Sequence, residues 1–292
     1  VFFPPSCSQL NFDGIDDFVD LGNHYNFSAG FSIEAWIKPH STSGTKTIFS
    51  KRSSENQNAG YDLSLNNGAP TFRVLDKSVV SGSKVNTNRW FHIAAVYNPG
   101  SQLKIYVDGI EIQTNASNIP NSVAATETPA LIGATYAPNE IIESKDHFEG
   151  YIEEVRIWEG AISATQIRFF MNQRLEKEGD NVSGAVLGNN LNLPNAPEAI
   201  TWTKLNGYYQ LLAQNNLIGD GFTGNLGNIG ATANGLLKNI QDMQENTAPM
   251  PYESNNGGAW HNRSSWDSNS TKFWTFPNDK GINGEEINWN IA

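Results

Sequence analysis

The chain has 292 residues, enough for two ordinary domains, and its formal net charge is −11. A nucleic-acid surface needs clustered Lys and Arg, so this charge and the lack of any basic run exclude a nucleic-acid partner. Eight Trp, nine Tyr and fifteen Phe supply core material and exclude a disordered chain. The single cysteine, Cys7, allows no internal disulfide, and no apolar run approaches the roughly 20 residues of a transmembrane helix.

Apolar and polar residues alternate from Leu10 to Trp158, which is the period of half-buried strands. The clearest segments are 31–37, 61–65, 71–74, 90–97 and 103–107. Asp108-Gly109 lies between two β-rich arms and predicts a hairpin over 103–112. Many short antiparallel strands without intervening helices predict an all-β sandwich or barrel.

A single helical signal follows these strands. Ser163 and Gln166 have the spacing of a capping box, and the apolar residues from Ile167 to Leu175 are near helical spacing. We interpret this segment as a short helix that closes the sandwich.

The composition changes after Glu178. The rest of the chain is richer in Asn, Gly and Pro and contains five of the eight Trp. Residues 207–212 and 286–291 have strand character, whereas 235–240 is ambiguous. We therefore predict a sandwich domain over residues 1–178 and a smaller β-rich accessory module over 179–292.

Five segments together resemble the laminin-G-like family, whose fold is a concanavalin A-like jelly roll. They occur in the family's order and are Leu10–Val19, Phe31–Ile37, Arg89–Tyr97, Ile105–Gly109 and Phe148–Trp158. The resemblance implies a jelly-roll β-sandwich over residues 1–178.

The second half resembles connectors in large exported proteins of Bacteroidetes-type bacteria. The resemblance is carried by residues 202–209, 237–240 with 247–252, and 287–291. It implies an adhesin-type, secreted or cell-surface protein, in which neighbouring domains of the same polypeptide are partners. The N-terminal residues lack the basic and apolar regions of a signal peptide, so we expect the chain to be cut from a longer polypeptide.

An acidic cluster is the most chemically suggestive feature. Asp13, Asp16 and Asp17 lie close together around Gly14, and Ca²⁺ prefers such oxygen ligands. The resemblance implies that the first and last strands lie together and often hold a structural calcium. Glu153 stands where the family usually has Asp, and we include it among the predicted metal ligands.

Alternation puts Glu153 on one face with Val155 and Ile157, which indicates a buried carboxylate that needs a cation or hydrogen bonds. The alternative is that Glu153 pairs with a Lys or Arg and that the N-terminal Asp residues only form solvated turns.

The sequence gives no support for catalysis. The carboxylate triplet E-x-D-x-x-E of related β-glucanases is missing, as are H-E-x-x-H and G-x-S-x-G. We therefore predict that the chain is not an enzyme.

Aromatic side chains indicate where a ligand could bind, because sugar C–H faces stack on Trp and Tyr. The candidates are Tyr136, Trp260, Trp266 and Trp274, although packing in the core is the alternative for each. The leading hypothesis is a binding or adhesion module for a glycan or a cell-surface protein, with a structural calcium. The alternatives are a structural spacer and an ancillary carbohydrate-binding domain of a secreted glycoside hydrolase.

Overall fold

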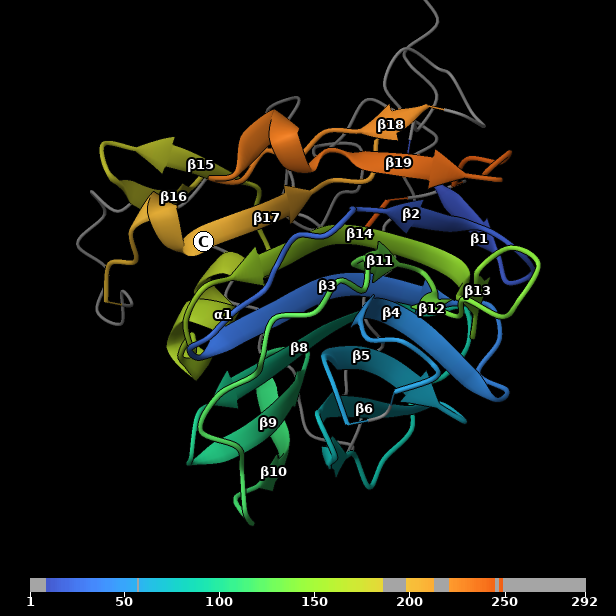
Figure 1. Cartoon of the computed structure of the whole chain (residues 1–292). Coiled ribbons are helices and arrows are strands. Elements are labelled where there is room, and N and C mark those ends of the chain that lie inside the picture. Colours follow the sequence, from blue (N-terminus) through green and yellow to red (C-terminus); the bar gives the residue numbers. More distant parts are fainter. Residues whose placement is uncertain (1–8, 57, 186–197, 213–220, 245–246, 249–292) are drawn as a thin grey trace, which may run out of the picture.

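Two antiparallel sheets pack face to face as a sandwich in the computed structural model (Figure 1). The model describes residues 9–56, 58–185, 198–212, 221–244 and 247–248. The prediction of an all-β sandwich is confirmed.

Sheet I has seven strands. Six of them follow the order β1-β14-β3-β8-β9-β10, and the seventh, β17, pairs with the same edge of β14 as β1 does. Its strands are β1 (Asn11–Asp13), β14 (Glu149–Trp158), β17 (Leu205–Tyr209), β3 (Phe31–Pro39), β8 (Phe91–Asn98), β9 (Gln102–Val107) and β10 (Ile110–Asn115). Figure 1 shows β17 running beside β14.

Sheet II has eight strands in the order β18-β19-β2-β11-β4-β5-β6-β7. They are β18 (Phe222–Thr223), β19 (Gly235–Lys238), β2 (Phe18–Asp20), β11 (Leu131–Ile132), β4 (Thr45–Lys51), β5 (Tyr61–Asn66), β6 (Ala69–Val74) and β7 (Lys77–Val80). Two small ribbons are added, β12 (Thr135–Tyr136) with β13 (Ser144–Lys145), and β15 (Leu175–Glu178) with β16 (Asn181–Gly184).

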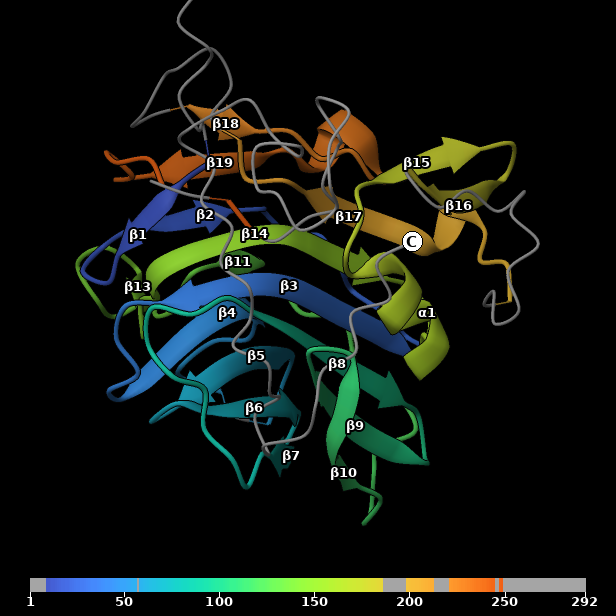
Figure 2. The same ribbon diagram turned by 180° about the vertical axis from the view of Figure 1, so that it is seen from behind.

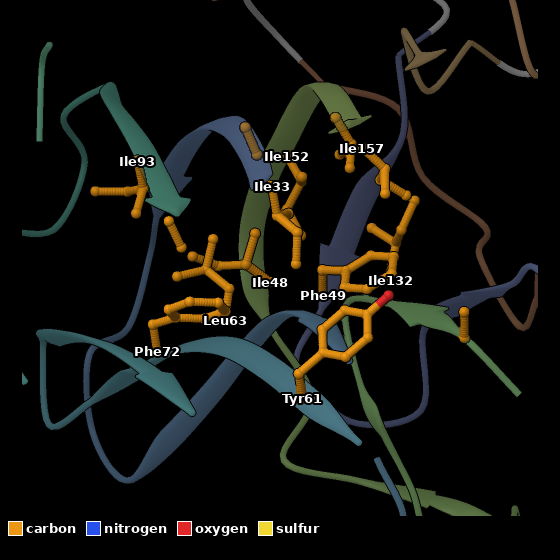
Figure 3. Close-up of a cluster of buried hydrophobic side chains, with 14 of the residues drawn as sticks. Ile33, Ile48, Phe49, Tyr61, Leu63, Phe72, Ile93, Ile132, Ile152 and Ile157 are labelled. Atoms are coloured by element: carbon orange, nitrogen blue, oxygen red, sulfur yellow. The ribbon is translucent and has the colours of Figure 1, made fainter. Parts of the chain in front are cut away.

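The core lies between the two sheets and is formed by alternate side chains of each (Figure 3). Sheet I contributes Ile33, Ile93, Ile152 and Ile157, and sheet II contributes Ile48, Phe49, Tyr61, Leu63, Phe72 and Ile132. This explains the two-residue period of the sequence, because the inward residues of each regular strand are apolar, whereas many outward residues are polar.

The predicted hairpin is confirmed. Strands β9 and β10 pair in antiparallel register across Asp108 and Gly109, whose φ angles are 50° and 76°. Two successive positive φ values are those of a type I′ turn, which Asp-Gly favours.

The predicted short helix is α1 (Ala164–Phe170), which lies near one end of β3 and β14 (Figure 2). Both bonds of the capping box form between Ser163 and Gln166, as expected. The helix ends before Leu175, which instead begins β15. Within the described residues, no helix is long and apolar enough to span a membrane.

Strands that follow Glu178 extend both sheets. β17 pairs with β14 in sheet I, and β19 pairs with β2 in sheet II. The described part of the second half is therefore hydrogen-bonded to the jelly roll. The division into domains 1–178 and 179–292 stays a prediction, and the expected strand at 286–291 lies outside the described residues.

Candidate functional site

The acidic residues that follow β1 come together in one loop. This acid loop, residues 13–17, connects β1 to β2. One carboxylate oxygen from each of Asp13, Asp16 and Asp17 lies within 4.8 Å of the others. Asp13 Oδ1 accepts the backbone N–H of Ile15 at 2.7 Å, and Asp17 Oδ2 accepts that of Asp13 at 2.9 Å. The loop thus holds its own carboxylates close together.

Gly14 is required within the acid loop. Its φ is 79°, and a Cβ at this position would lie only 2.7 Å from the Cβ of Glu149. Because Asp13 is paired with Glu149, the loop lies directly against the beginning of β14.

This arrangement disfavours the charged form of Asp17. Burial raises the pKa of Asp17 to about 6, and the nearby charges of Asp13 and Asp16 act in the same direction. A cation beside Asp17 would offset both effects.

The donor chemistry of the acid loop fits calcium. Ca²⁺ takes six to eight oxygen ligands, mainly from carboxylates and carbonyl groups. The cluster of Asp13, Asp16 and Asp17 could therefore hold a metal ion, and these side chains would be its carboxylate ligands.

Calcium is expected to raise the melting temperature through the acid loop. At a concentration of one hundred times the dissociation constant, binding to the folded state adds about 2.7 kcal/mol to the free energy of unfolding. The gain should increase between about pH 4 and pH 7, because protons compete with the cation for Asp17. Calorimetry in calcium and in EDTA measures this difference.

Two variants make this calorimetric test specific. Asp17→Asn removes a proposed ligand and should abolish the gain, whereas Asp20→Asn, at the last residue of β2, should retain it. Equal melting temperatures of the wild-type chain in calcium and EDTA would contradict the prediction.

Other groups reach the acid loop from distant parts of the chain, and the sequence analysis missed them. Asn239 Nδ2 donates to the carbonyl oxygen of Asp16 at 3.1 Å, across 223 residues. Asp242 adds to the negative potential at Asp17. Burial lowers the pKa of His147, which the negative charge of Asp16 only partly offsets. Such contacts depend on tertiary structure, so no local sequence pattern indicates them.

The expectation that Glu153 shares a face with Val155 is wrong. The register between β14 and β3 shifts between Glu153 and Arg156, and Glu154 has a φ of 52°. This bulge inserts a residue, so Ile152 and Val155 both face the core and Glu153 faces outward from it.

The structure does not bring Glu153 to the acid loop. Glu153 is four residues along β14 from Glu149, the partner of Asp13, which is about 13 Å at the spacing of a strand. It is buried, and its Oε1 accepts the backbone N–H of Ala248 at 3.0 Å. Burial and the charge of Glu154 raise the pKa of Glu153 well above its usual range, which favours a neutral carboxyl group.

Replacing Glu153 by Gln is expected to stabilise the chain at neutral pH. A raised pKa in the folded state means that stability present below about pH 4.5 is lost as the pH rises. Gln keeps the hydrogen bond to Ala248 without a charge, so the gain should be of the order of 1–3 kcal/mol at pH 7 and small at pH 4. Urea unfolding at the two pH values measures it, and a loss of stability at both would refute the assignment.

The predicted ligand-binding aromatic residues have different outcomes. Tyr136 is half-buried and packs against Phe18, Leu131 and Ala134, and its carbonyl oxygen accepts the N–H of Ser54 at 2.8 Å. Its ring is therefore partly used in packing, and a ligand contact stays a prediction. The other three candidates, Trp260, Trp266 and Trp274, lie outside the described residues.

A buried ionic network crosses the outer face of sheet I. Arg156, on β14, donates to Glu34 at 3.3 Å and to Glu154 at 3.0 Å. Tyr208 donates to Glu154 at 2.6 Å, and Trp158 donates to Glu34 at 3.2 Å. Burial opposes the charge of Arg156, but Glu34 and Glu154 outweigh it and raise the pKa of Arg156 above its usual value.

The segment from α1 to β15 covers this network. Arg156 also donates to the carbonyl oxygens of Phe170 and Gln173, at 2.8 and 2.6 Å. Glu34 and Arg156 have no exposed surface, and Glu154 is 4% exposed. This part of the sheet is therefore closed to a ligand.

The outer face of sheet II holds a second buried carboxylate. Arg73 donates to both carboxylate oxygens of Asp62, with Nε 2.9 Å from Oδ1 and Nη2 2.8 Å from Oδ2. Arg52 Nε lies 3.1 Å from Oδ1. Asp62 has no exposed surface, so its charge is used within the fold.

Residues 13–168, more than half of the chain, match the family model described as the concanavalin A-like lectin/glucanases superfamily. The chain belongs to this superfamily, as the resemblance of its five segments implied. No curated protein matches the chain.

Several solved structures are similar to the chain. A protein from Bacteroides ovatus, provisionally described as carbohydrate-binding, is 19% identical with a TM-score of 0.55; the alignment covers 85% of this chain and 62% of that protein. Domain 4 of an extracellular arabinanase from Geobacillus stearothermophilus is 21% identical with a TM-score of 0.43, over 54% of this chain and 73% of that one. The CBM40 of the Ruminococcus gnavus IT-sialidase is 16% identical with a TM-score of 0.43, over 56% and 97%. The chain thus spans less than two thirds of the Bacteroides ovatus protein, and the similarity shows the fold alone.

Proposed function

We propose that this chain is a non-catalytic glycan-binding module of a secreted or bacterial cell-surface protein. Its superfamily contains both lectins and glucanases, so the fold alone allows binding or hydrolysis. The observation that favours binding is the closed ionic network of Glu34, Glu154 and Arg156.

A glycosidase needs two carboxyl groups that flank the scissile bond of an accessible substrate. The carboxylates of Glu34 and Glu154 both bind the guanidinium group of Arg156. Both are buried beneath the segment from α1 to β15. A sugar cannot reach them in this fold, and their charges already have a partner. The carboxylate of Asp62 is likewise buried and paired with arginine side chains.

Because these carboxylates are not accessible, we look to the loops at the ends of the sandwich for recognition. The acid loop could contribute calcium, which would order the loop and could contact sugar hydroxyl groups. The described function of the Bacteroides ovatus protein, which shares the fold, supports a carbohydrate ligand. In a longer surface polypeptide, such a module would serve adhesion to glycans or to glycoproteins.

A glycan array with the wild-type chain, in calcium and in EDTA, tests the proposal. We expect binding to a restricted set of glycans, weakened by EDTA if the acid loop orders the site. Absence of binding to every glycan in both conditions would overturn it and favour a structural spacer. Asp17→Asn should reproduce the effect of EDTA, whereas Asp20→Asn should bind as the wild type does.

A further inference from the structure

A small cavity opens at the end of β14 that is distant from the acid loop. It has a volume of about 260 Å³, and Glu159, directly after β14, is part of its wall. Asp13 is paired with Glu149, the first residue of the same strand, so the ten residues of β14 separate the two places. The cavity is therefore distinct from the candidate calcium site.

One wall of the cavity is the segment between β2 and β3, in which Tyr25 is fixed by buried hydrogen bonds. The carbonyl oxygen of Tyr25 accepts the hydroxyl of Tyr61 at 2.6 Å, and the hydroxyls of Tyr25 and Tyr209 are bonded to each other. Tyr25 has a φ of 63°, a conformation that the surrounding bonds maintain. Phe27 lies next to it in the same wall.

Lys51 binds the same segment through hydrogen bonds of its ammonium group. Its side chain is buried, and Nζ donates to Asn23 Oδ1 at 2.6 Å and to the carbonyl oxygen of Thr128. Asn26, in the cavity wall, donates to Asn23 Oδ1 at 2.9 Å and accepts the N–H of Thr126 at 3.0 Å. The wall is therefore ordered before any ligand arrives, which lowers the entropic cost of binding.

The opposite wall carries polar groups that suit hydroxyl groups. Glu159 Oε2 accepts from Asn206 Nδ2 at 3.4 Å, and Lys204 lies 3.3 Å from Glu159 Oε1. These contacts are long and the side chain of Glu159 is 45% exposed, so a ligand can compete for its oxygens. Ser28 adds a hydroxyl group at the rim.

We propose that this cavity is a subsite for one uncharged monosaccharide, the terminal sugar of the glycan in the function proposed above, on which this inference rests. Its volume is below that of sites for drug-sized ligands and suits a single ring. Glu159, Asn206 and Asn26 would bind vicinal hydroxyl groups, while Tyr25 and Phe27, whose side chains are buried in the core, would support the wall behind them. The charged residue of the lining is Glu159, and the neighbouring Lys204 is already paired with it, so the lining offers an acidic sugar no unpaired cation.

A more open groove of about 720 Å³ is the control site with which the cavity is compared. It lies between the edge strands β7 and β10 and is lined by residues such as Ser78, Gln113 and Ser117, with no aromatic side chain. A sugar there would have hydroxyl and amide partners but no carboxylate, which is the stronger acceptor for sugar hydroxyl groups.

Matched variants of the cavity and of the open groove test the subsite. Their affinity for the neutral glycan that binds best on the array is measured by titration calorimetry. Ser28→Trp blocks the cavity from an exposed position, and Glu159→Ala with Asn206→Ala removes its carboxylate and one amide. Each should weaken binding at least roughly tenfold, which is about 1.4 kcal/mol, while the melting temperature stays near that of the wild type. Ser117→Trp, in the open groove, should bind unchanged.

The outcomes separate this inference from the proposed function. If the wild type binds a neutral glycan and all cavity variants bind it equally well, the subsite is wrong and the proposed function stands. Loss of binding in Ser117→Trp alone would move the site to the open groove and equally overturn the inference. If the wild type binds no glycan, the proposed function itself fails.

Discussion

Replacing Arg156 by Met lowers the free energy of unfolding by about 3–5 kcal/mol, because it leaves Glu34 and Glu154 buried without their common counter-charge. The change also removes the donors to the carbonyl oxygens of Phe170 and Gln173, which attach the segment after α1 to sheet I. Urea unfolding followed by tryptophan fluorescence measures the loss.

The control for Arg156→Met removes the charges as a set. With Glu34→Gln and Glu154→Gln added, no charge is left uncompensated, so a large part of the lost stability should return. A loss below about 1 kcal/mol in the single variant would mean that the network is not closed as described.

Replacing Asp62 by Asn lowers the free energy of unfolding by about 2–4 kcal/mol. Asp62 is fully buried between Arg52 and Arg73, and Arg52 is only 5% exposed, so Asn leaves a buried guanidinium group without a carboxylate. Because Arg73 is partly exposed, the loss of stability should be smaller than for Arg156→Met. Thermal and urea unfolding should agree on its size.

Asp76→Asn is the matched control for Asp62→Asn. Asp76 also pairs with a cation, Lys77, at 2.7 Å, but its side chain is 54% exposed. Water solvates both charges there, so no measurable change is expected. Equal effects of the two substitutions would show that the Asp62 cluster is not a buried one.

These two predictions bear on function as well as on stability. Carboxylates that perform catalysis are commonly kept at a cost to stability, so their removal often stabilises the fold. Glu34, Glu154 and Asp62 are instead expected to stabilise it, through arginine partners within the sheets. Stabilisation by Glu34→Gln or Glu154→Gln would argue for an active site and against the proposed function.

The strands that were predictable from the sequence are those with a regular two-residue period. β3, β5, β6, β8 and β9 each place alternate side chains in the core, and Asp108-Gly109 determines the following turn. The capping box of α1 was predictable for the same reason, since its bonds are local.

The bulge in β14 was not predictable from alternation. A pattern of period two assumes that each residue changes face, and the extra residue at Glu154 breaks that assumption for Glu153. Strands of two residues, such as β11 and β18, are too short to show any period. Their pairing depends on the neighbouring strands.

The acid loop could be predicted as a cluster because its carboxylates are neighbours in the sequence. The contacts of Asn239 and Asp242 with that loop could not, because over 220 residues separate them from it. The cavity at Glu159 was missed for the same reason, since its walls come from the loop around Tyr25 and from β17 at Asn206, which share no motif.

Native mass spectrometry of the wild-type chain with a library of neutral oligosaccharides, in calcium, tests the central claim most directly. A non-catalytic glycan-binding module is expected to give complexes whose added mass equals that of an intact oligosaccharide, with the same oligosaccharide recovered after prolonged incubation. Shortened sugars in the mixture would show hydrolysis, and a chain free of any bound sugar would show that it does not bind these glycans. Either result would contradict the account.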